Sequence, residues 1–125
     1  MKKNFATPLL FIFLLVQCNH NKSEQIEGTW QLQTLEINGT VLKGNSLGDW
    51  QWKFATKENY TSVIAGKTEE GLYTLKEGKL TLKSTTYKER PEQILSIIHL
   101  DSIQMDLISA DDKNKSTLHF LKLKD

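Results

Sequence analysis

Residues 71–82 read GLYTLKEGKLTL, two short runs of alternating apolar and polar residues separated by a glutamate and a glycine. Tyr73 and Leu75 share one face of the first run, and Leu80 and Leu82 share one face of the second. A period of two is typical of a β-strand with one buried face, and a glycine-containing turn between two such runs predicts a β-hairpin. This stretch therefore predicts an antiparallel sheet.

The same alternation extends on both sides of the hairpin. Trp50, Trp52 and Phe54 alternate with polar residues, and no stretch after residue 28 keeps an apolar period of 3.6 residues for three helical turns. The strands that we predict are 28–37, 50–54, 60–66, 71–75, 80–83, 93–100, 103–109 and 116–123. Eight strands joined mainly by hairpin-length turns predict an all-β fold, either an antiparallel up-and-down barrel or a sandwich. We favour the barrel, because closure leaves no open edge.

The first of these strands changes phase along its length. Trp30 and Leu32 have one parity, whereas Leu35 and Ile37 have the other, so a bulge or bend is expected at Thr34. The dipeptide 38–39, Asn-Gly, suits the positive φ angles of a tight turn, and residues 40–42 are expected to pair back briefly.

The N-terminus has the features of an export signal. Lys2 and Lys3 precede the apolar run 9–16, which falls within the ~7–15 residues of a signal core and is shorter than the roughly 20 residues that span a bilayer. A polar stretch, 19–24, follows. The alternative is a buried core helix, but a soluble domain rarely opens with basic residues, an all-round apolar stretch and a polar linker.

Residues 15–18, Leu-Val-Gln-Cys, resemble the lipobox of bacterial lipoproteins. The resemblance implies that the signal is cut before Cys18 and that this cysteine carries acyl chains, although Gln17 stands where a small residue is usual. By resemblance to lipoprotein sorting, Asn19 implies the outer membrane and not retention at the inner one. We expect the domain to face the periplasm, although no residue distinguishes this orientation from a surface-facing one. The predicted organisation is a signal peptide over 1–17, a lipidated cysteine and polar tether over 18–27, and a barrel domain over 28–125.

Composition limits the partners of the mature domain. The net charge of the whole chain is +1, and loss of Lys2 and Lys3 would leave the domain close to neutral, with lysines and glutamates interspersed. That pattern argues against nucleic-acid binding. Cys18 is the single cysteine, so no internal disulfide can form and the fold must depend on packing.

Gly28-Thr29-Trp30, at the start of the first predicted strand, matches the G-x-W signature of lipocalins, and the rhythm of 71–82 resembles bacterial lipocalin-like lipoproteins. The resemblance extends from residue 28 to residue 123. It implies that Trp30 closes the barrel base against a basic residue near the end of the last strand, here Lys122 or Lys124. It also implies an interior that often holds a lipophilic molecule.

The chain lacks the arginine and the T-D-Y motif of fuller lipocalin signatures. A second resemblance competes with the first. Trp30-Gln31-Leu32 followed by Asn38-Gly39 is similar to the small β domain of heat-shock lipoproteins, but the internal cysteine-asparagine motif of that domain is missing after Cys18.

The residues that carry chemistry are dispersed. His20 lies in the tether, His99 ends a strand beside Asp101, and His119 alternates with apolar neighbours. An unrecognised enzyme would need His99, Asp101 and Asp106 to converge in a cleft, which the strand alternation argues against.

Other catalytic and ligand-binding motifs are also missing. Asp111-Asp112 lacks the glycine and distal glutamate of a calcium loop, and the chain contains no G-x-S-x-G elbow, phosphate-binding glycine loop or C-x-x-C pair. We therefore expect no catalysis, no metal site and no cofactor.

The aromatic residues are the feature best suited to a ligand, because flat apolar walls bury a lipophilic body and tyrosine hydroxyls orient it. In small barrels, however, such residues more often form a core that the protein fills with its own side chains. The candidate lining residues, chosen by strand parity, are Trp50, Trp52, Phe54, Tyr60, Tyr73, Leu82, Met105 and Phe120.

Two hypotheses of function follow from the sequence. The first is a lipid-anchored, non-catalytic lipocalin-like protein that binds or carries a small hydrophobic molecule in the bacterial cell envelope. The second is a filled barrel whose outer surface docks an envelope protein, as a structural or inhibitory module. An internal volume of ~300 Å³ or more favours the first, and a packed interior with an exposed apolar patch favours the second.

Overall fold

The computed structural model describes residues 25–56, 58–110 and 114–124. The predictions for the signal peptide, for Cys18 and for most of the tether lie outside these residues, as do His20, Asp111 and Asp112.

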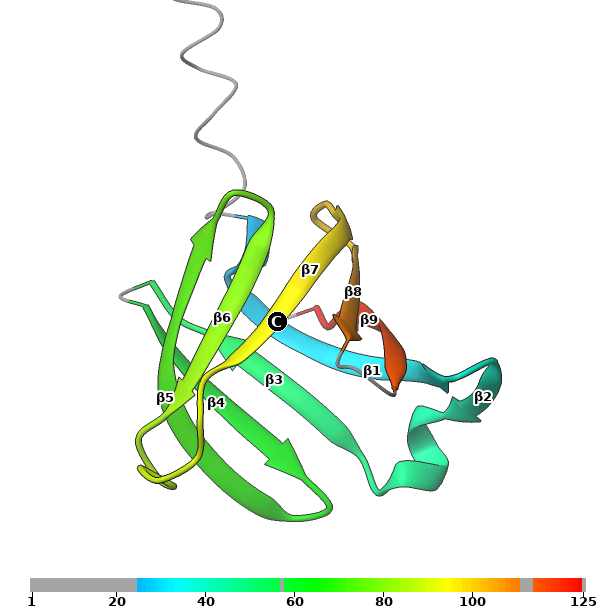
Figure 1. Ribbon diagram of the computed structural model, residues 1–125, viewed down its shortest axis with the longest axis horizontal. Helices are drawn as coiled ribbons and strands as arrows, with labels where there is room; N and C mark the ends of the chain where they lie inside the picture. Colours follow the sequence, from blue (N-terminus) through cyan, green and yellow to red (C-terminus); the bar gives the residue numbers. More distant parts are fainter. Residues whose placement is uncertain (1–24, 57, 111–113, 125) are drawn as a thin grey trace, which may run out of the picture.

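The described chain is almost entirely strand, as the alternation predicts (Figure 1). One short 3₁₀ helix, η1, interrupts it. The elements are β1 (Gly28–Ile37), β2 (Thr40–Lys43), η1 (Gly44–Leu47), β3 (Trp50–Phe54), β4 (Asn59–Ile64), β5 (Lys67–Lys76), β6 (Lys79–Ser84), β7 (Gln93–Leu100), β8 (Gln104–Ala110) and β9 (Lys115–Lys122).

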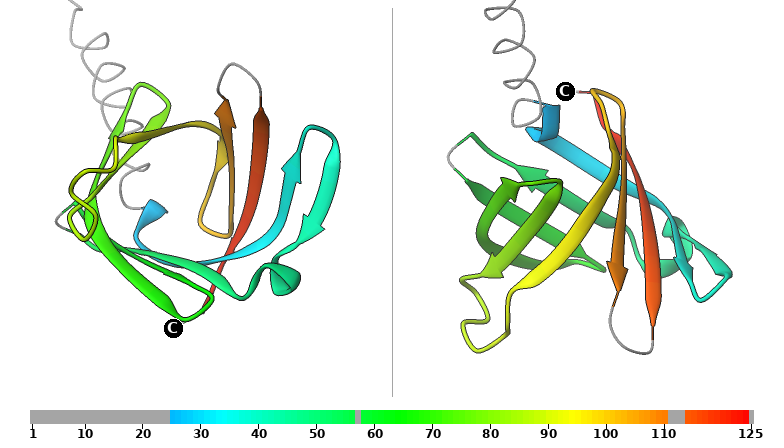
Figure 2. Two further views of the ribbon diagram at one scale, coloured as in Figure 1. Left: turned by 60° about the horizontal axis from the view of Figure 1, so that its bottom comes forward. Right: turned by 45° about the horizontal axis from the view of Figure 1, so that its top comes forward.

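Eight of the strands close into an antiparallel barrel. The order is β1-β3-β4-β5-β6-β7-β8-β9, and β9 pairs with β1 to complete the circle. The extra strand β2 shares one edge of β1 with β3, since β3 pairs with the first half of β1 and β2 with the second half. Figure 2 shows the strands wrapped around one axis and the β1–β2 hairpin extending to the side. The predicted fold class is confirmed.

Local predictions in β1 are also confirmed. The pairing of β1 with β9 shifts register between Leu32 and Thr34, which is the expected bulge. Asn38 and Gly39 have φ angles of 49° and 90°, as a tight turn between twisted strands requires. The predicted return of residues 40–42 is the strand β2.

The predicted strand 71–75 is too short, because β5 begins at Lys67. The chain turns at Ala65 and Gly66, which both have positive φ angles, so the strand before it ends at Ile64 and not at residue 66. Lys67 to Glu70 include no apolar residue, so the alternation pattern could not reveal them as strand. Pairing with β4 holds these residues in the sheet.

Buried apolar side chains from every barrel strand form one core. Most of the interior is therefore occupied by the protein's own side chains. The members of the core are Ile26, Trp30, Leu32, Leu35, Trp52, Phe54, Tyr60, Tyr73, Leu80, Leu82, Leu95, Met105, Leu107, Leu118 and Phe120.

The barrel has two different ends. At the closed end, β1 begins and the β5–β6 turn and β7–β8 loop lie near it, at the top of Figure 1. At the opposite end, which we call the mouth, β1 ends, and η1, the β4–β5 turn and the β6–β7 loop also lie at this end.

Candidate functional site

The closed end is plugged by Trp30, which is fully buried. Its indole nitrogen donates to the carbonyl of Ile26 at 2.8 Å. Lys122, its cross-strand partner, places its ammonium 5.2 Å from the centroid of the Trp30 ring and donates to the carbonyl of Gln25 at 3.0 Å. A Cβ at Gly28 would lie 2.9 Å from Lys122 Cε, so the glycine leaves room for the lysine stem. The structure thus brings Gly28, Trp30 and Lys122 together.

The middle of the barrel is filled by aromatic rings. Trp52 stacks on Phe120 with ring centroids 4.8 Å apart, and Phe54 meets Tyr73 edge-on at 4.9 Å. The Tyr73 hydroxyl donates to the carbonyl of Ala55 at 2.8 Å. Burial raises the pKa of Tyr73, and the negative charges of nearby glutamates raise it further. Such ring pairs contribute about 0.5–1.5 kcal/mol each beyond the area that they bury.

All eight candidate lining residues therefore point inward. Seven of them are buried in the core, and Trp50 is partly buried and packs against it. Tyr73 also borders a small pocket of about 280 Å³ beside Glu27 and Glu58 at the closed end. Whether any of the eight lines a ligand stays a prediction.

Trp50 differs from the other buried aromatics in its polar atom. Its ring lies edge-on to Trp52, with centroids 6.1 Å apart, and its Nε1 is buried without a hydrogen-bond partner among the described residues. A buried N–H with no acceptor costs about 1–3 kcal/mol. Trp50 is directly opposite Ile64 in the β3–β4 ladder, at the mouth.

A pocket of about 310 Å³ opens at the mouth beside Ile64. We call it the mouth pocket. Strands β4 and β5 form one wall, and the β6–β7 loop forms the other. The residues that line it are Ser62, Ile64, Lys67, Thr68, Glu69, Tyr87 and Arg90.

A charged cluster occupies the rim of this pocket. Glu69 Oε1 accepts from Arg90 at 2.7 Å, and Glu69 Oε2 accepts from the Tyr60 hydroxyl at 3.3 Å. The Arg90 guanidinium also lies over the ring of Tyr87, 4.4 Å from its centroid. Burial raises the pKa of Tyr60 to about 12, and the charge of Glu69 and the hydrogen bond to it add to the shift.

Gly71 makes room for Tyr60 in this cluster. The two residues are cross-strand partners, and a Cβ at Gly71 would lie 2.5 Å from the tyrosine ring and 2.3 Å from the carbonyl of Lys83. The ring therefore packs closely against the backbone of Gly71, where a side chain would clash with it.

The β6–β7 loop that carries Arg90 is tied to the sheet. The backbone N–H of Thr85 donates to the carbonyl of Glu70 at 2.9 Å, and the Thr86 hydroxyl accepts from the Glu70 N–H at 2.8 Å. Lys83 Nζ donates to the carbonyl of Arg90 at 2.7 Å. The position of Arg90 is therefore set by several contacts besides its ion pair.

Ser62, Glu69, Tyr87 and Arg90 are not among the candidate site residues that the sequence predicts. Glu69 has the same parity as Tyr73 and faces the interior, so extending the alternation of 71–75 by two residues would have found it. Arg90 could not be found in this way, because it lies in a loop whose path depends on tertiary contacts.

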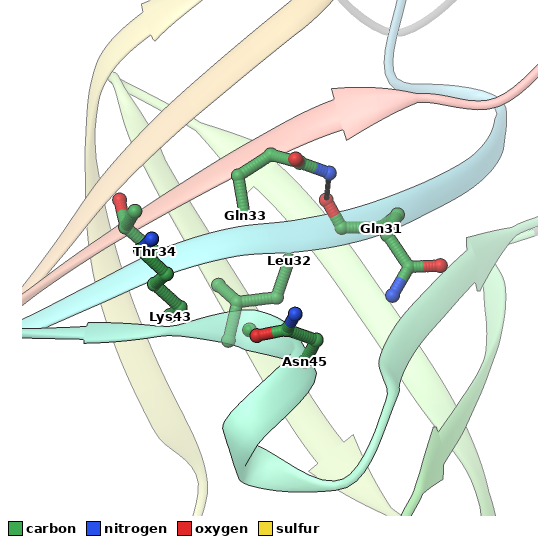
Figure 3. Close-up of a pocket in the computed structure, with 7 residues that line it drawn as sticks. Gln31, Leu32, Gln33, Thr34, Lys43 and Asn45 are labelled. Atoms are coloured by element: carbon green, nitrogen blue, oxygen red, sulfur yellow. Dashed lines mark hydrogen bonds between the residues drawn. The ribbon is translucent and has the colours of Figure 1, made fainter.

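A second pocket, of about 400 Å³, lies on the outside of the barrel against β1, β2 and η1 (Figure 3). Polar side chains such as Gln31, Gln33 and Asn45 surround it. Gln33 donates to the carbonyl of Gln31 at 3.3 Å. A Cβ at Gly44 would lie 2.0 Å from the carbonyl oxygen of Leu32, so glycine is required where η1 meets the bulged strand.

His99 and His119 lie on the outer face of the barrel, yet closer to acids than the sequence indicated. His99, Asp106 and His119 are successive cross-strand neighbours on β7, β8 and β9. His119 Nδ1 is 2.8 Å from Asp106, and His99 Nε2 is 2.7 Å from Asp101. The expectation that nothing groups these residues is therefore corrected, because strand register aligns them on the outside of the barrel.

Asp101 is held as a carboxylate by its turn. Backbone N–H groups of Ile103 and Gln104 donate to Oδ1 at 2.8 Å, and with His99 they lower the pKa of Asp101 to about 2. This is the pattern of a turn in which an aspartate accepts backbone bonds. Within residues 25–56, 58–110 and 114–124, no three histidine, cysteine or acidic side chains are arranged to hold a metal ion.

The family model of the lipocalin-like domain matches residues 26–107. The chain belongs to the family of lipocalin-like domains. Its fold is similar to that of a lipocalin-like protein from Bacteroides uniformis ATCC 8492, with a TM-score of 0.61 and 21% identity, over 79% of this chain and 99% of that one. An uncharacterized protein from Bacteroides eggerthii DSM 20697 is similar at a TM-score of 0.59 and 18% identity, over 78% of this chain and 99% of that one.

At these identities the two structures support the lipocalin-like fold alone. A comparison with curated proteins finds no match. No helix in the described part of this lipocalin-like chain is long and apolar enough to cross a bilayer.

Proposed function

We propose that this protein is a lipid-anchored, non-catalytic lipocalin-like protein of the bacterial envelope that binds or carries a small hydrophobic molecule. The observation that carries the proposal is the mouth pocket. Its volume of about 310 Å³ is at the lower end of the ~300–1,000 Å³ typical of small-molecule sites. Ile64 and Tyr87 offer it apolar surface. Trp50, whose buried N–H has no partner in the described chain, is directly opposite Ile64 in the β3–β4 ladder.

The ligand would sit at the mouth and not deep in the barrel. The stacked pair of Trp52 and Phe120 fills the middle, and Trp30 fills the closed end. Of the aromatic residues chosen from the sequence, Trp50 and Tyr60 are the ones next to the mouth pocket, through Ile64 and Glu69.

The anchor is proposed from the sequence. Acylation of Cys18 would hold the domain on a membrane, because each buried methylene contributes about 0.8 kcal/mol. We propose that this membrane is the outer one and that the domain faces the periplasm. The measurement is the intact mass of the protein from host membranes, compared with that of Cys18→Ala. We expect an acyl mass increment in the wild type only; equal masses and equal membrane partition would refute the anchor.

The binding function is tested by native mass spectrometry of the mature protein, extracted gently from its own host. A reproducible adduct of small-molecule mass is expected. A clean apo mass, repeated after incubation with total host lipid extract, would reject the proposal.

A specific observation also favours a second function, the docking of an envelope protein on the outer surface. Ile94 and Ile98 face outward from β7 with 57% and 55% of their surfaces exposed, and Ile103 in the next loop is 65% exposed. Exposed apolar side chains grouped on one element are typical of interaction surfaces. Replacing Ile94 and Ile98 by threonine should then abolish capture of the partner and leave small-molecule binding unchanged.

A further inference from the structure

Glu69, the acidic residue that lines the mouth pocket, already has a partner for each of its carboxylate oxygens. Glu69 uses one oxygen for Arg90 and the other for Tyr60. With 18% of its side chain exposed, it is largely shielded from solvent. A ligand that needs an acceptor would therefore have to displace an existing bond.

Donors, in contrast, are in excess. A guanidinium has five N–H groups, and the contact with Glu69 uses the Nη1 end of Arg90. Lys67 and Ser62 line the same pocket, and their side chains carry further donors. Two cations and one anion among the lining residues leave the pocket with a positive balance.

Arg90 is placed before any ligand arrives. The ring of Tyr87 supports its guanidinium, Glu69 orients it, and Lys83 holds its backbone carbonyl. A donor that is already ordered loses less conformational entropy when it binds, which favours affinity. Glu69 thus acts as a positioning residue for Arg90.

We infer that the mouth pocket binds small amphipathic carboxylates, with the carboxylate on Arg90 and Lys67 and the apolar body against Ile64 and Tyr87. A planar carboxylate matches the guanidinium fork, and a monoanion matches the single excess positive charge better than a phosphate dianion does. This inference rests on the proposed function and names the chemical class of its ligand.

The test compares octanoate with octan-1-ol, which share a chain and differ in head group. The mature protein is embedded in lipid nanodiscs and titrated calorimetrically with each probe, with empty nanodiscs as the blank. Octanoate is expected to bind about tenfold or more tightly than octan-1-ol, because a hydrogen bond to a charged group is stronger than one between neutral groups.

Two variants assign the preference to the pocket. Arg90→Gln should bring the two affinities within about threefold of each other, and Lys67→Gln should reduce the preference in part. Lys88→Gln is the matched control: it removes one positive charge from the same loop but lies outside the pocket lining, and the preference should persist. Thermal midpoints of the variants check folding. If Arg90→Gln is unstable, Lys67→Gln still tests the inference, because Lys67 is exposed and its replacement should not disturb the fold.

Equal binding of octanoate and octan-1-ol would overturn the carboxylate inference and leave the proposed function standing. The inference is likewise overturned if Lys88→Gln loses the preference as fully as Arg90→Gln. Failure of octanoate to bind also overturns it, and the adduct seen in native mass spectrometry then decides separately whether the proposed function survives.

Discussion

Trp30 and Trp50 mark opposite ends of one barrel and differ in how their indole N–H groups are satisfied. Trp30 is fully buried, donates to Ile26 and lies under the ammonium of Lys122. Trp50 is partly buried, and its N–H has no acceptor within the described chain. Native proteins satisfy nearly all buried polar groups, so an exception points to a site kept for another purpose. The closed end is built for stability, and the mouth retains unused donors.

The largest effect that this contrast predicts is at the closed end. Trp30→Phe leaves the Ile26 carbonyl unpaired and opens a small cavity, so the free energy of unfolding should fall by about 2–3 kcal/mol. Urea denaturation measures it. A loss below about 0.5 kcal/mol, the usual range for surface changes, would remove the basis for calling this end structural.

Lys122→Met also tests how much the closed end contributes to stability, and its effect on the free energy of unfolding should be smaller. The methionine keeps an apolar stem beside Trp30 but loses the hydrogen bond to Gln25 and the cation over the ring. A decrease of about 1–2 kcal/mol is expected by urea denaturation. Lys124→Met is the control, and an equal loss there would mean that general charge, and not the contact with Trp30, is responsible.

At the mouth, Tyr60→Phe should reduce stability by about 1 kcal/mol at neutral pH and change the alkaline behaviour. Folding raises the pKa of Tyr60 from 10.0 to about 12, so the folded state favours the neutral phenol. That contribution is complete below pH 10 and is lost as the pH rises from 10 to about 12. Urea titrations at several pH values should show that the free energy of unfolding declines less steeply between pH 10 and about 12 in the variant than in the wild type. Tyr87→Phe is the control. An unchanged slope would contradict the buried Tyr60–Glu69 contact.

The smallest effect on stability is expected at Trp50. Trp50→Phe removes an N–H that has no acceptor in the described structure. The free energy of unfolding should therefore either fall by no more than about 0.5 kcal/mol or rise. Comparing the stability losses of Trp50→Phe and Trp30→Phe in the same urea series shows how differently the two ends depend on their indole N–H groups. A loss as large as that of Trp30→Phe would show that Trp50 is also a structural plug.

Much of the fold follows from local patterns. Alternation predicts the barrel strands, and the turn at Asn38-Gly39 and the bulge near Thr34 appear where the sequence places them. The exception is the start of β5, where polar residues 67–70 lie in the ladder without an apolar marker. Pairing with β4 decided that boundary.

The candidate site follows from the sequence only in part. Inward parity identifies Trp50 and Tyr60, but not the ion pair that joins Glu69 to Arg90, residues 21 positions apart. That contact depends on the path of the β6–β7 loop, which bonds to the backbone of Glu70. The line of His99, Asp106 and His119 depends in the same way on strand register, including the bulge in β7.

The sequence by itself determined that this chain forms strands, which side chains face inward, and where the tight turns lie, because a period of two and turn chemistry are local properties. The tertiary structure alone decided which hydrogen-bond donors remain at the mouth. They depend on the β6–β7 loop, which brings Arg90 to Glu69, and on the pairing of β3 with β4, which sets Trp50 opposite Ile64.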